Sequence, residues 1–573
     1  MTDKITRRAA LTTGLAAGAA SCATSPVMTP YIAVGESAGG IFAHGVASGD
    51  PGPDSVVIWT RISTMEARPT ETVVWETAGD EAFTDMRSKG EATTTSSLDW
   101  TVKVLITGLE PGAVLYYRFR IGDAYSPVGR TRTLPMGAVD SARFAVVSCS
   151  NFPFGYFNVY DLIARRNDID AVIHLGDYIY EYSTEGYGGE TGAALGRNHQ
   201  PAHEVVSLAD YRMRHAQYKA DPASQAMHAA HPMIAIWDDH ETSNDSWSGG
   251  AENHQTASEG EWNARRRAAL QAYYEWMPVR EPERTPEAFF RSFTYGDLLT
   301  IAAIETRLMA RAQQFEYGDV IPTLKTPADV ERFKNEILWD ETREMLGPAQ
   351  FDFLDRTFRS SVGAGQPWRL VANQIIMANV IAPDLTPHVT EEDIAAIEQQ
   401  WDQARAFVKA STLGLPTNFD AWDGYPAARE RFYDMARQSG DDGMIVITGD
   451  THTWWANDLA AKDGAHMGVE LGVHSVSSPS PYRKEFLGGK GADYALLTNR
   501  DNKDVRYLSG EHHGYIDLEI TRSAARAEFV AVDTIESGNY SAFIKAAFDI
   551  EKKKGSAEFS DADGLGFKEG ILF

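Results

Sequence analysis

Three short apolar runs in this chain each end in carboxylates, and this pattern constrains the fold more than any other feature. The runs and the carboxylates that follow them are 171–175 with Asp177, 233–237 with Asp238 and Asp239, and 444–448 with Asp450. Bounded apolar runs of this length are typical of buried strands in an α/β sheet. Because sites in such sheets form outside the carboxyl ends of the strands, the sequence predicts one metal-binding edge.

Further donor side chains stand within a few residues of these carboxylates. They are Tyr180 after Asp177, His240 and Asn244 after Asp239, and His452 after Asp450. A phenolate is an unusual ligand that favours a hard ferric ion, and a carboxylate that bridges two cations is the usual core of a two-metal hydrolase. Each residue also has a plain structural explanation, such as Asp238 and Asp239 capping a helix. Such explanations do not account for all the strand ends together.

The chain has two cysteines, Cys22 and Cys149, and the second follows another apolar run, 144–148. Cys22 lies near the N-terminus in a segment that we expect to be an export signal, so Cys149 has no expected disulfide partner. Two interpretations are open. Cys149 is a small buried residue of the core, or, if its strand shares a sheet with 171–175, it is a thiolate ligand beside Asp177.

The N-terminus resembles a twin-arginine export signal. Arg7 and Arg8 precede an Ala/Gly-rich stretch that ends near Ala20 and is too short to span a bilayer as a mature helix. We therefore predict a periplasmic or secreted protein that uses the twin-arginine export machinery, with no transmembrane segment in the mature chain. The signal is cleaved beside Cys22 or leaves a lipid anchor on it, and the absence of the usual preceding Leu favours cleavage. A disordered tail that contains Arg-Arg is the alternative.

Length and charge limit the possible architectures and partners. A chain of 573 residues is too long for one ordinary core, so more than one domain is expected. A formal net charge of −27 without a basic run argues against a nucleic-acid-binding module. Nothing in the sequence indicates the oligomeric state.

Four parts can be separated along the chain. Residues 1–30 form the signal, and residues 36–135 contain alternating runs typical of an immunoglobulin- or fibronectin-like β-sandwich. Residues 142–535 alternate strand-like runs with helical candidates at 159–166, 264–276 and 348–358, which predicts one α/β (α+β) catalytic domain. Residues 536–573 are expected to form a C-terminal helix, within the amphipathic segment 543–550, and a polar tail.

Taken in order, the motifs of this chain resemble those of the PhoD-like alkaline phosphatase and phosphodiesterase family. The matching stretches are 44–51 (HGVASGDP), 148–149 (SC), 155–160 (GYFNVY), 174–181 (HLGDYIYE), 211–215 (YRMRH), 237–241 (WDDHE), 372–374 (ANQ) and 448–452 (TGDTH). Each is weak alone, and the ordered set is highly specific. Two positions depart from the family pattern: Glu305 stands where Asp is expected, and Ser150-Asn151 follows the cysteine where Gln is expected.

The resemblance implies a metallophosphoesterase-like β-sandwich core flanked by helices, related in chemistry to purple acid phosphatases. It implies an exported enzyme with Fe³⁺ and Ca²⁺ as cofactors, with two calcium ions expected. The C-terminal helix would partly shield the site or simply pack.

Site residues follow from the same resemblance. The implied iron ligands are Cys149, Asp177 and Tyr180, with Asp177 bridging to calcium. Asp239, Asp450 and Asn244 are the expected remaining ligands. His240 and His452 would contact phosphate or protonate the leaving oxygen. Possible phosphate contacts are Arg212, Arg214, Arg307 and Asn151.

We therefore predict a metal-dependent hydrolase of small phosphate esters, in which metal-activated hydroxide attacks phosphorus in line. The alternatives are a phospholipase D-like or other phosphodiester-specific hydrolase on the same metal core, an oxidative or sulfatase-like metalloenzyme, and a hydrolase that uses Cys149 as a nucleophile. A non-enzymatic surface-binding protein is a further alternative, which the intact ligand set argues against.

Overall fold

The computed structural model describes residues 29–30, 40–63, 69–398, 404–441, 443–484, 489–553, 556–560 and 570–571. The predicted export signal, apart from Thr29 and Pro30, and Cys22 lie outside the described residues. Among the described residues, no helix combines the length and apolar character needed to cross a membrane.

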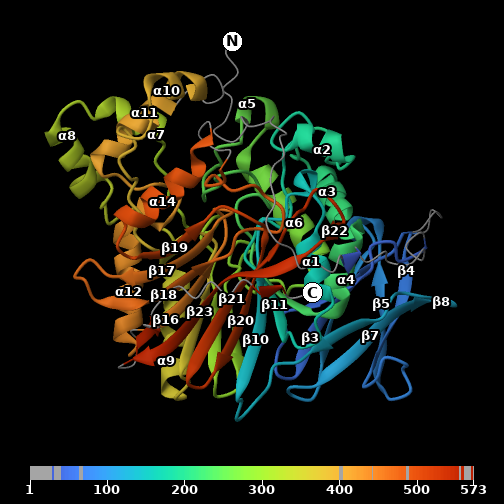
Figure 1. Cartoon of the computed structure of the whole chain (residues 1–573). Helices are drawn as coiled ribbons and strands as arrows, with labels where there is room; N and C mark the ends of the chain where they lie inside the picture. Colours follow the sequence, from blue (N-terminus) through green and yellow to red (C-terminus); the bar gives the residue numbers. More distant parts are fainter. Residues whose placement is uncertain are drawn as a thin grey trace.

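Two large β-sheets form the centre of the molecule (Figure 1). The 11-stranded sheet runs, in spatial order, β24 (Ser556–Phe559), β23 (Ala542–Lys553), β21 (Ala524–Val532), β20 (Gly514–Thr521), β10 (Ser141–Val147), β11 (Ala171–His174), β12 (Pro232–Ala235), β2 (Val46–Gly49), β3 (Ser55–Arg61) and β6 (Thr101–Thr107), with β25 (Gly570–Ile571) paired to β23. The 7-stranded sheet runs β13 (Arg291–Tyr295), β14 (Leu299–Ala303), β15 (Trp368–Ala372), β16 (Met444–Thr448), β18 (His466–Gly472), β17 (Trp454–Ala460) and β19 (Val505–Ser509).

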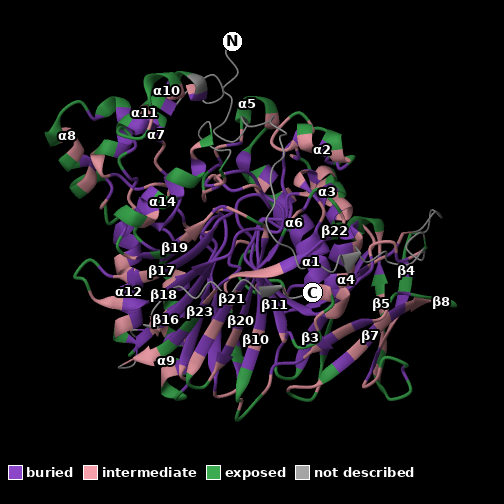
Figure 2. Ribbon diagram, in the orientation of Figure 1, coloured by how far each residue is buried: buried purple, intermediate pink, exposed green. Residues whose placement is uncertain are grey.

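The two sheets pack face to face and are covered by helices on their outer faces. Val146 and Ile173 of the first sheet share one buried cluster with Leu370 and Ile447 of the second. Beyond the first sheet lie α1 (Asn158–Ala164), α3 (Leu208–Ala220), α4 (Pro222–Ala230) and α6 (Trp262–Trp276), and beyond the second lie α9 (Gly347–Gly363) and α12 (Pro426–Gln438). Figure 2 shows the central strands as mostly buried and the outer helices as partly exposed. This is the predicted β-sandwich core flanked by helices.

The apolar runs found in the sequence are strands, but they do not lie in one sheet. β10, β11 and β12 are neighbours and parallel in the first sheet, whereas β16 is parallel to β15 in the second. The helices predicted at 159–166, 264–276 and 348–358 correspond to α1, α6 and α9. The spacing of apolar residues and the polar residues that follow a strand are local features of the sequence. The assignment of a strand to one of two sheets depends instead on contacts with distant segments.

The predicted N-terminal β region is all-β, as expected, and one of its layers continues the catalytic sheet. β2 pairs with β12 in parallel, with Ser48 opposite Pro232 and Gly49 opposite Met233. The second layer consists of β5 (Met86–Thr94), β4 (Glu71–Ala78), β7 (Val114–Ile121) and β8 (Ala124–Tyr125), with β9 (Gly129–Arg132) paired to β7. A buried cluster that includes Val56, Ile58, Tyr117 and Phe119 joins the two layers.

The expected C-terminal helix is wrong, because residues 543–550 belong to strand β23. This strand pairs antiparallel with β21 over its length. From Ala546 to Glu551 the burial alternates with a period of two, with Phe548 and Ile550 buried and Asp549 and Glu551 exposed. Backbone pairing with β21 and this alternation favour a strand over the helix that the apolar residues suggested.

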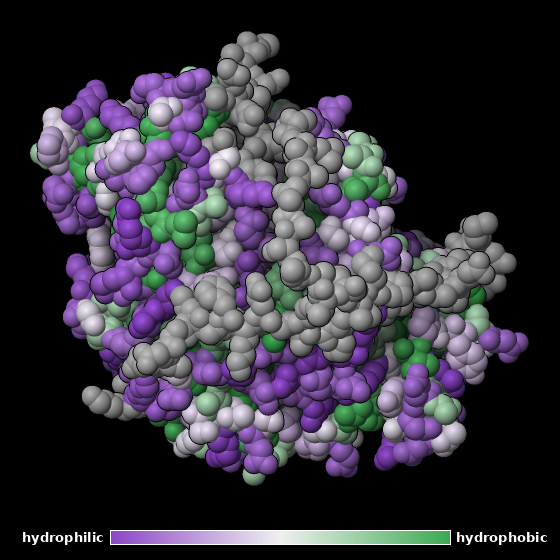
Figure 3. Space-filling model, in the orientation of Figure 1, coloured by the Kyte–Doolittle hydropathy of each residue, from purple (hydrophilic) through white to green (hydrophobic). Residues whose placement is uncertain are grey.

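A helical insertion stands above the second sheet, at the upper left of Figure 1. It contains α7 (Tyr317–Val320), α8 (Pro327–Arg332), α10 (Glu391–Glu398) and α11 (Ala404–Ala410). Its own small core includes Tyr317, Phe333 and Phe419. On the face shown in Figure 3, hydrophilic and hydrophobic side chains are interspersed among the coloured residues.

Substitution Phe548→Ala tests the strand assignment. The Phe548 side chain is 8% exposed and its ring lies 5.1 Å from that of Phe529. Its removal is expected to lower the free energy of unfolding by about 3–5 kcal/mol, as for other buried Phe→Ala changes. Chemical denaturation measures this, with the exposed neighbour variant Asp549→Ala as the control. If Phe548→Ala left the stability unchanged and raised the KM for a phosphate ester, residues 543–550 would instead act as the predicted helix that covers the site.

Candidate metal centre

Strained backbone marks the loops that follow the strands. At the ends of β10, β11 and β16, positive φ is found at Cys149 (60°), Asp177 (55°), Asp450 (59°) and His452 (50°). Such conformations cost about 1–3 kcal/mol each and persist where the surroundings enforce them. Gly176 has φ 103°, and a Cβ there would lie 2.4 Å from the Cβ of Asp238, so only glycine fits between the two loops.

Three groups of potential ligands meet at this edge. They are Cys149, Asp177 and His452; Asp177, Asp239 and His240; and Asp238, Asp239 and Asp450. In each group one donor atom per residue lies within 4.8 Å of the others, and all are buried. Asp177 is common to the first two groups and Asp239 to the last two. Shared carboxylates of this kind are what neighbouring cations require.

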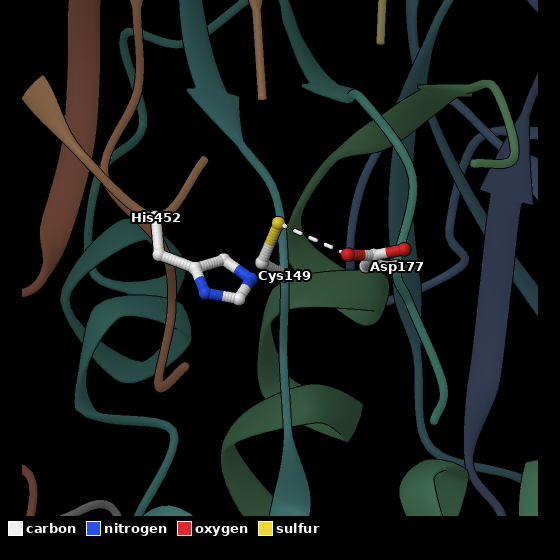
Figure 4. A group of neighbouring side chains, drawn as sticks. All are labelled: Cys149, Asp177 and His452. Atoms are coloured by element: carbon white, nitrogen blue, oxygen red, sulfur yellow. Dashed lines mark hydrogen bonds between the residues drawn. The ribbon is translucent and has the colours of Figure 1, made fainter. Parts of the chain in front are cut away.

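The first group is drawn in Figure 4, where Cys149 lies between the imidazole of His452 and the carboxylate of Asp177. The Cys149 Sγ is 3.4 Å from Asp177 Oδ2. The Tyr180 hydroxyl lies 3.0 Å from the same oxygen and 3.1 Å from His452 Nε2. His452 Nδ1 lies 3.1 Å from the carbonyl oxygen of Pro479, to which it can donate. Nε2 is therefore the nitrogen available as a ligand, which agrees with the strand-end pattern rather than with the phosphate contact that the resemblance implied.

The acidic groups of this cluster resist ionisation in the absence of a cation. Burial, and then the charge of Asp239, raises the pKa of Asp177 well above its ordinary value. Burial also raises the pKa of the Cys149 thiol and of the Tyr180 phenol. Multivalent cations reverse this effect, because they stabilise the ionised ligands. The donor chemistry therefore fits bound metal: one group combines sulfur, nitrogen and oxygen, and the third is all carboxylate.

His240 is held by a buried carboxylate, Glu181. The two side chains meet through His240 Nδ1 and Glu181 Oε2 at 2.7 Å, and both are fully buried. Glu181 Oε1 accepts from the backbone N–H of Asn244 at 2.8 Å and from Asn253 Nδ2 at 2.9 Å. The ring of Tyr180 lies 4.1 Å from that of His240. Glu181 fixes the orientation of the His240 imidazole and leaves Nε2 as the nitrogen that can face the donor groups.

Asn244, a predicted ligand, is joined to His240 through Glu181, which accepts the backbone N–H of Asn244. Its Nδ2 donates to Glu252 Oε2 at 3.2 Å, while its Oδ1 has no hydrogen-bond partner among the described residues. Because the amide nitrogen is used in this hydrogen bond, the amide oxygen of Asn244 is the atom available to a metal ion.

Arg307 lies inside the carboxylate cluster rather than at its rim. Its Nε contacts Asp238, its Nη1 binds both carboxylate oxygens of Asp420 at 2.8 and 2.9 Å, and its Nη2 lies 3.3 Å from Asp450 Oδ1. Asp420 was not predicted, and no local motif could have revealed it, because 113 positions separate it from Arg307.

The other predicted phosphate contacts are placed differently. Arg212 binds Glu275 through two bonds of 2.6 and 2.7 Å and donates to the carbonyl of Ser97, so the structure does not bring it to the donor groups. Arg214 is buried and donates to backbone carbonyls, including that of Tyr182 at 3.0 Å, so it clamps the loop that carries Tyr180. Both guanidiniums are used within the fold.

Asn151 is fully buried two residues after Cys149. Its side-chain nitrogen and oxygen both have no hydrogen-bond partner among the described residues. An unsatisfied buried amide is costly, so this side chain has capacity for a ligand.

Two acidic residues that support the site were missed, although each ends a quoted motif. Glu181 ends 174–181, and Glu241 ends 237–241. Glu241 accepts the backbone N–H groups of Asp177, Tyr178 and Asp238 at 3.1, 2.6 and 2.8 Å, and burial raises its pKa to about 7. The available signal for both residues was a carboxylate at the end of a motif that also contains a predicted ligand.

Glu305, the departure from the family pattern, stays outside the three donor groups. Its carboxylate accepts the backbone N–H groups of Arg307 and Leu308 and the indole N–H of Trp237. It therefore holds the loop that carries Arg307.

Parallel strands of two packed sheets that deliver shared carboxylates, an imidazole and a thiol to one edge define the class of multi-metal hydrolases. Residues 144–529 match the model for PhoD-like phosphatase, and residues 30–135 match that for the PhoD-like phosphatase N-terminal domain. The chain therefore belongs to the PhoD-like phosphatase family and is a phosphate-ester hydrolase.

Two known proteins support this assignment. Alkaline phosphatase D of Bacillus subtilis (strain 168) is 34% identical over 533 residues, which cover 89% of this chain and 81% of that protein. A solved structure of PhoD is similar, with a TM-score of 0.73 and 31% identity, and the match covers 92% of this chain and 93% of that one.

Substitution Glu181→Gln tests the support of His240. Gln has the same shape but lacks the charge that holds the imidazole N–H, so turnover of a phosphate ester is expected to fall about 10- to 100-fold. The exposed variant Glu190→Gln is the control, and thermal unfolding checks that both proteins fold. Wild-type turnover in folded Glu181→Gln would show that the orientation of His240 does not matter.

Proposed function

We propose that this chain is an exported hydrolase of phosphate monoesters and diesters that holds one ferric ion and two calcium ions. The observation that carries this proposal is the chain of three donor groups linked through Asp177 and Asp239. The group with the Cys149 thiol, the His452 imidazole and the nearby Tyr180 phenol suits ferric iron. The groups dominated by carboxylate oxygens suit calcium, with Asn244 Oδ1 as a further ligand.

Bound there, these cations would polarise the phosphate oxygens and lower the pKa of the attacking water. The protein's own residues then have distinct roles. Asn151, whose buried amide has no partner among the described residues, contacts the phosphate oxygens, whereas Arg307 holds the surrounding carboxylates. His240, held through Nδ1 by Glu181, presents Nε2 to protonate the leaving oxygen. His452 serves as a ligand, because its Nδ1 is directed at the Pro479 carbonyl.

A nucleophilic role for Cys149 is disfavoured by its surroundings. Burial and the carboxylate of Asp177 raise the pKa of the thiol, whereas a nucleophilic cysteine needs a lowered pKa. The thiol suits coordination instead. Support for export is confined to the sequence, namely the twin-arginine segment at Arg7 and Arg8. Cleavage beside Cys22 remains the favoured outcome over a lipid anchor.

Calcium removal is the direct test of the hydrolase. Hydrolysis of 4-nitrophenyl phosphate and of bis(4-nitrophenyl) phosphate by natively exported protein is expected to stop in a calcium chelator and to return when calcium is added in excess. The ratio of the two rates separates a monoesterase from a phosphodiester-specific or phospholipase D-like enzyme. Full turnover in the chelator would rule out calcium as a required cofactor.

Visible colour is the test of the iron ligands. Tyrosinate and thiolate ligands on ferric iron absorb visible light, so the wild-type protein is expected to be coloured. Substitution Tyr180→Phe keeps the ring against His240 and is expected to remove the phenolate contribution to the absorption band. Tyr187→Phe is the matched control, and elemental analysis gives the iron content. An unchanged spectrum in iron-loaded Tyr180→Phe would exclude the phenol as a ligand.

A further inference from the structure

A second cavity of about 730 Å³ lies away from the metal centre, between the N-terminal β region and strand β13. None of the residues in the three donor groups lines it. Its lining includes Asp50, Arg280 and Arg291, together with Leu134, Met136 and Phe293. Ligand sites commonly occur at such junctions, with apolar walls and a few convergent polar groups.

Two arginines contact Asp50 in this cavity, and one of them does so through its guanidinium on the carboxylate. Asp50 is fully buried, and its Oδ1 accepts from Arg291 Nη2 at 3.1 Å while its Oδ2 accepts from the backbone N–H of Arg280 at 2.7 Å. The Arg280 side chain donates to the Asp50 carbonyl and to Ser55 Oγ, and among the described residues it has no carboxylate partner within 4.0 Å. Asp50 therefore pairs with one of the two guanidiniums, that of Arg291.

Arg291 also has unused donors. Its Nε and Nη1 are buried and have no hydrogen-bond partner among the described residues. Its guanidinium carbon lies 3.7 Å from the ring centre of Phe289. A buried charged donor without an acceptor is costly, and a carboxylate or phosphate head would satisfy it.

The two other acidic residues that line the cavity have partners of their own. Asp54 is exposed and accepts from Ser55 Oγ at 3.0 Å. Asp297 is bound to Arg522 at 2.7 Å.

The remaining wall of the cavity is apolar. Leu134 and Phe293 are each 4% exposed, so they form a well-packed part of the cavity wall. Met136 is 67% exposed and provides apolar surface for a ligand.

We propose that this cavity binds a small organic anion with a short apolar tail. The anionic head, a carboxylate or a phosphate-type group, pairs with Arg280 and Arg291, and the tail lies against Leu134, Met136 and Phe293. This site is separate from ester hydrolysis, so a negative result for this proposal does not affect the function proposed above.

Calorimetric titration of the full chain with octanoate and with octylphosphonate tests the site. Neither probe has a hydrolysable ester bond, and the rate of ester hydrolysis measured in parallel reports any binding of a probe at the metal centre. Saturable binding of either probe is expected, and the tighter probe identifies the preferred head group. Octylammonium, with the same tail and the opposite charge, is expected not to bind.

Two variants locate the binding. Arg280→Gln is expected to weaken binding about tenfold, the loss typical of a charged hydrogen-bond partner. Arg405→Gln makes the same change of charge on the exposed surface of α11 and is expected to bind like the wild type. The proposal is overturned if neither probe binds saturably, if octylammonium binds equally well, or if the two variants have the same affinity.

Discussion

Repulsion among buried carboxylates is the constraint around which this active site is organised. Asp177, Asp238, Asp239 and Asp450 lie within two overlapping groups, and burial raises the pKa of Asp177 and Asp238 well above the ordinary value. Arg307 contacts this cluster, and Asp238 and Asp420 hold its pKa well above the ordinary value although burial alone would lower it. One guanidinium cannot neutralise so many acids, so the ionised cluster is suited to multivalent cations.

Rigid support keeps these acids in place. Glu241 binds the backbone of two ligand loops, Glu181 holds His240, and Arg214 clamps the loop of Tyr180. The positive φ values of Cys149 and Asp177 show that these contacts outweigh local backbone strain. Such preorganisation is what electrostatic catalysis requires, because a site that is already ordered does not reorganise as charge develops.

The N-terminal β region is structurally continuous with the catalytic part. Pairing between β2 and β12 extends the first sheet into it, and β12 leads directly to Asp238. Arg291 adds a contact with the carbonyl of Ala235 at the end of the same strand. The cavity at this junction is therefore linked through Arg291 to the strand that leads to Asp238.

The sequence by itself determined the strands, the main helices and most donor residues. The spacing of apolar residues and the polar residues at the strand ends are local features, so Asp177, Asp239 and Asp450 could be selected without knowledge of any tertiary contact. Tertiary structure alone decided that β16 lies in a second sheet, that residues 543–550 form a strand, and that Arg212 binds Glu275. It also brought Asp420 to Arg307 across 113 positions. These outcomes depend on pairing and charge compensation between distant segments, which no local pattern encodes.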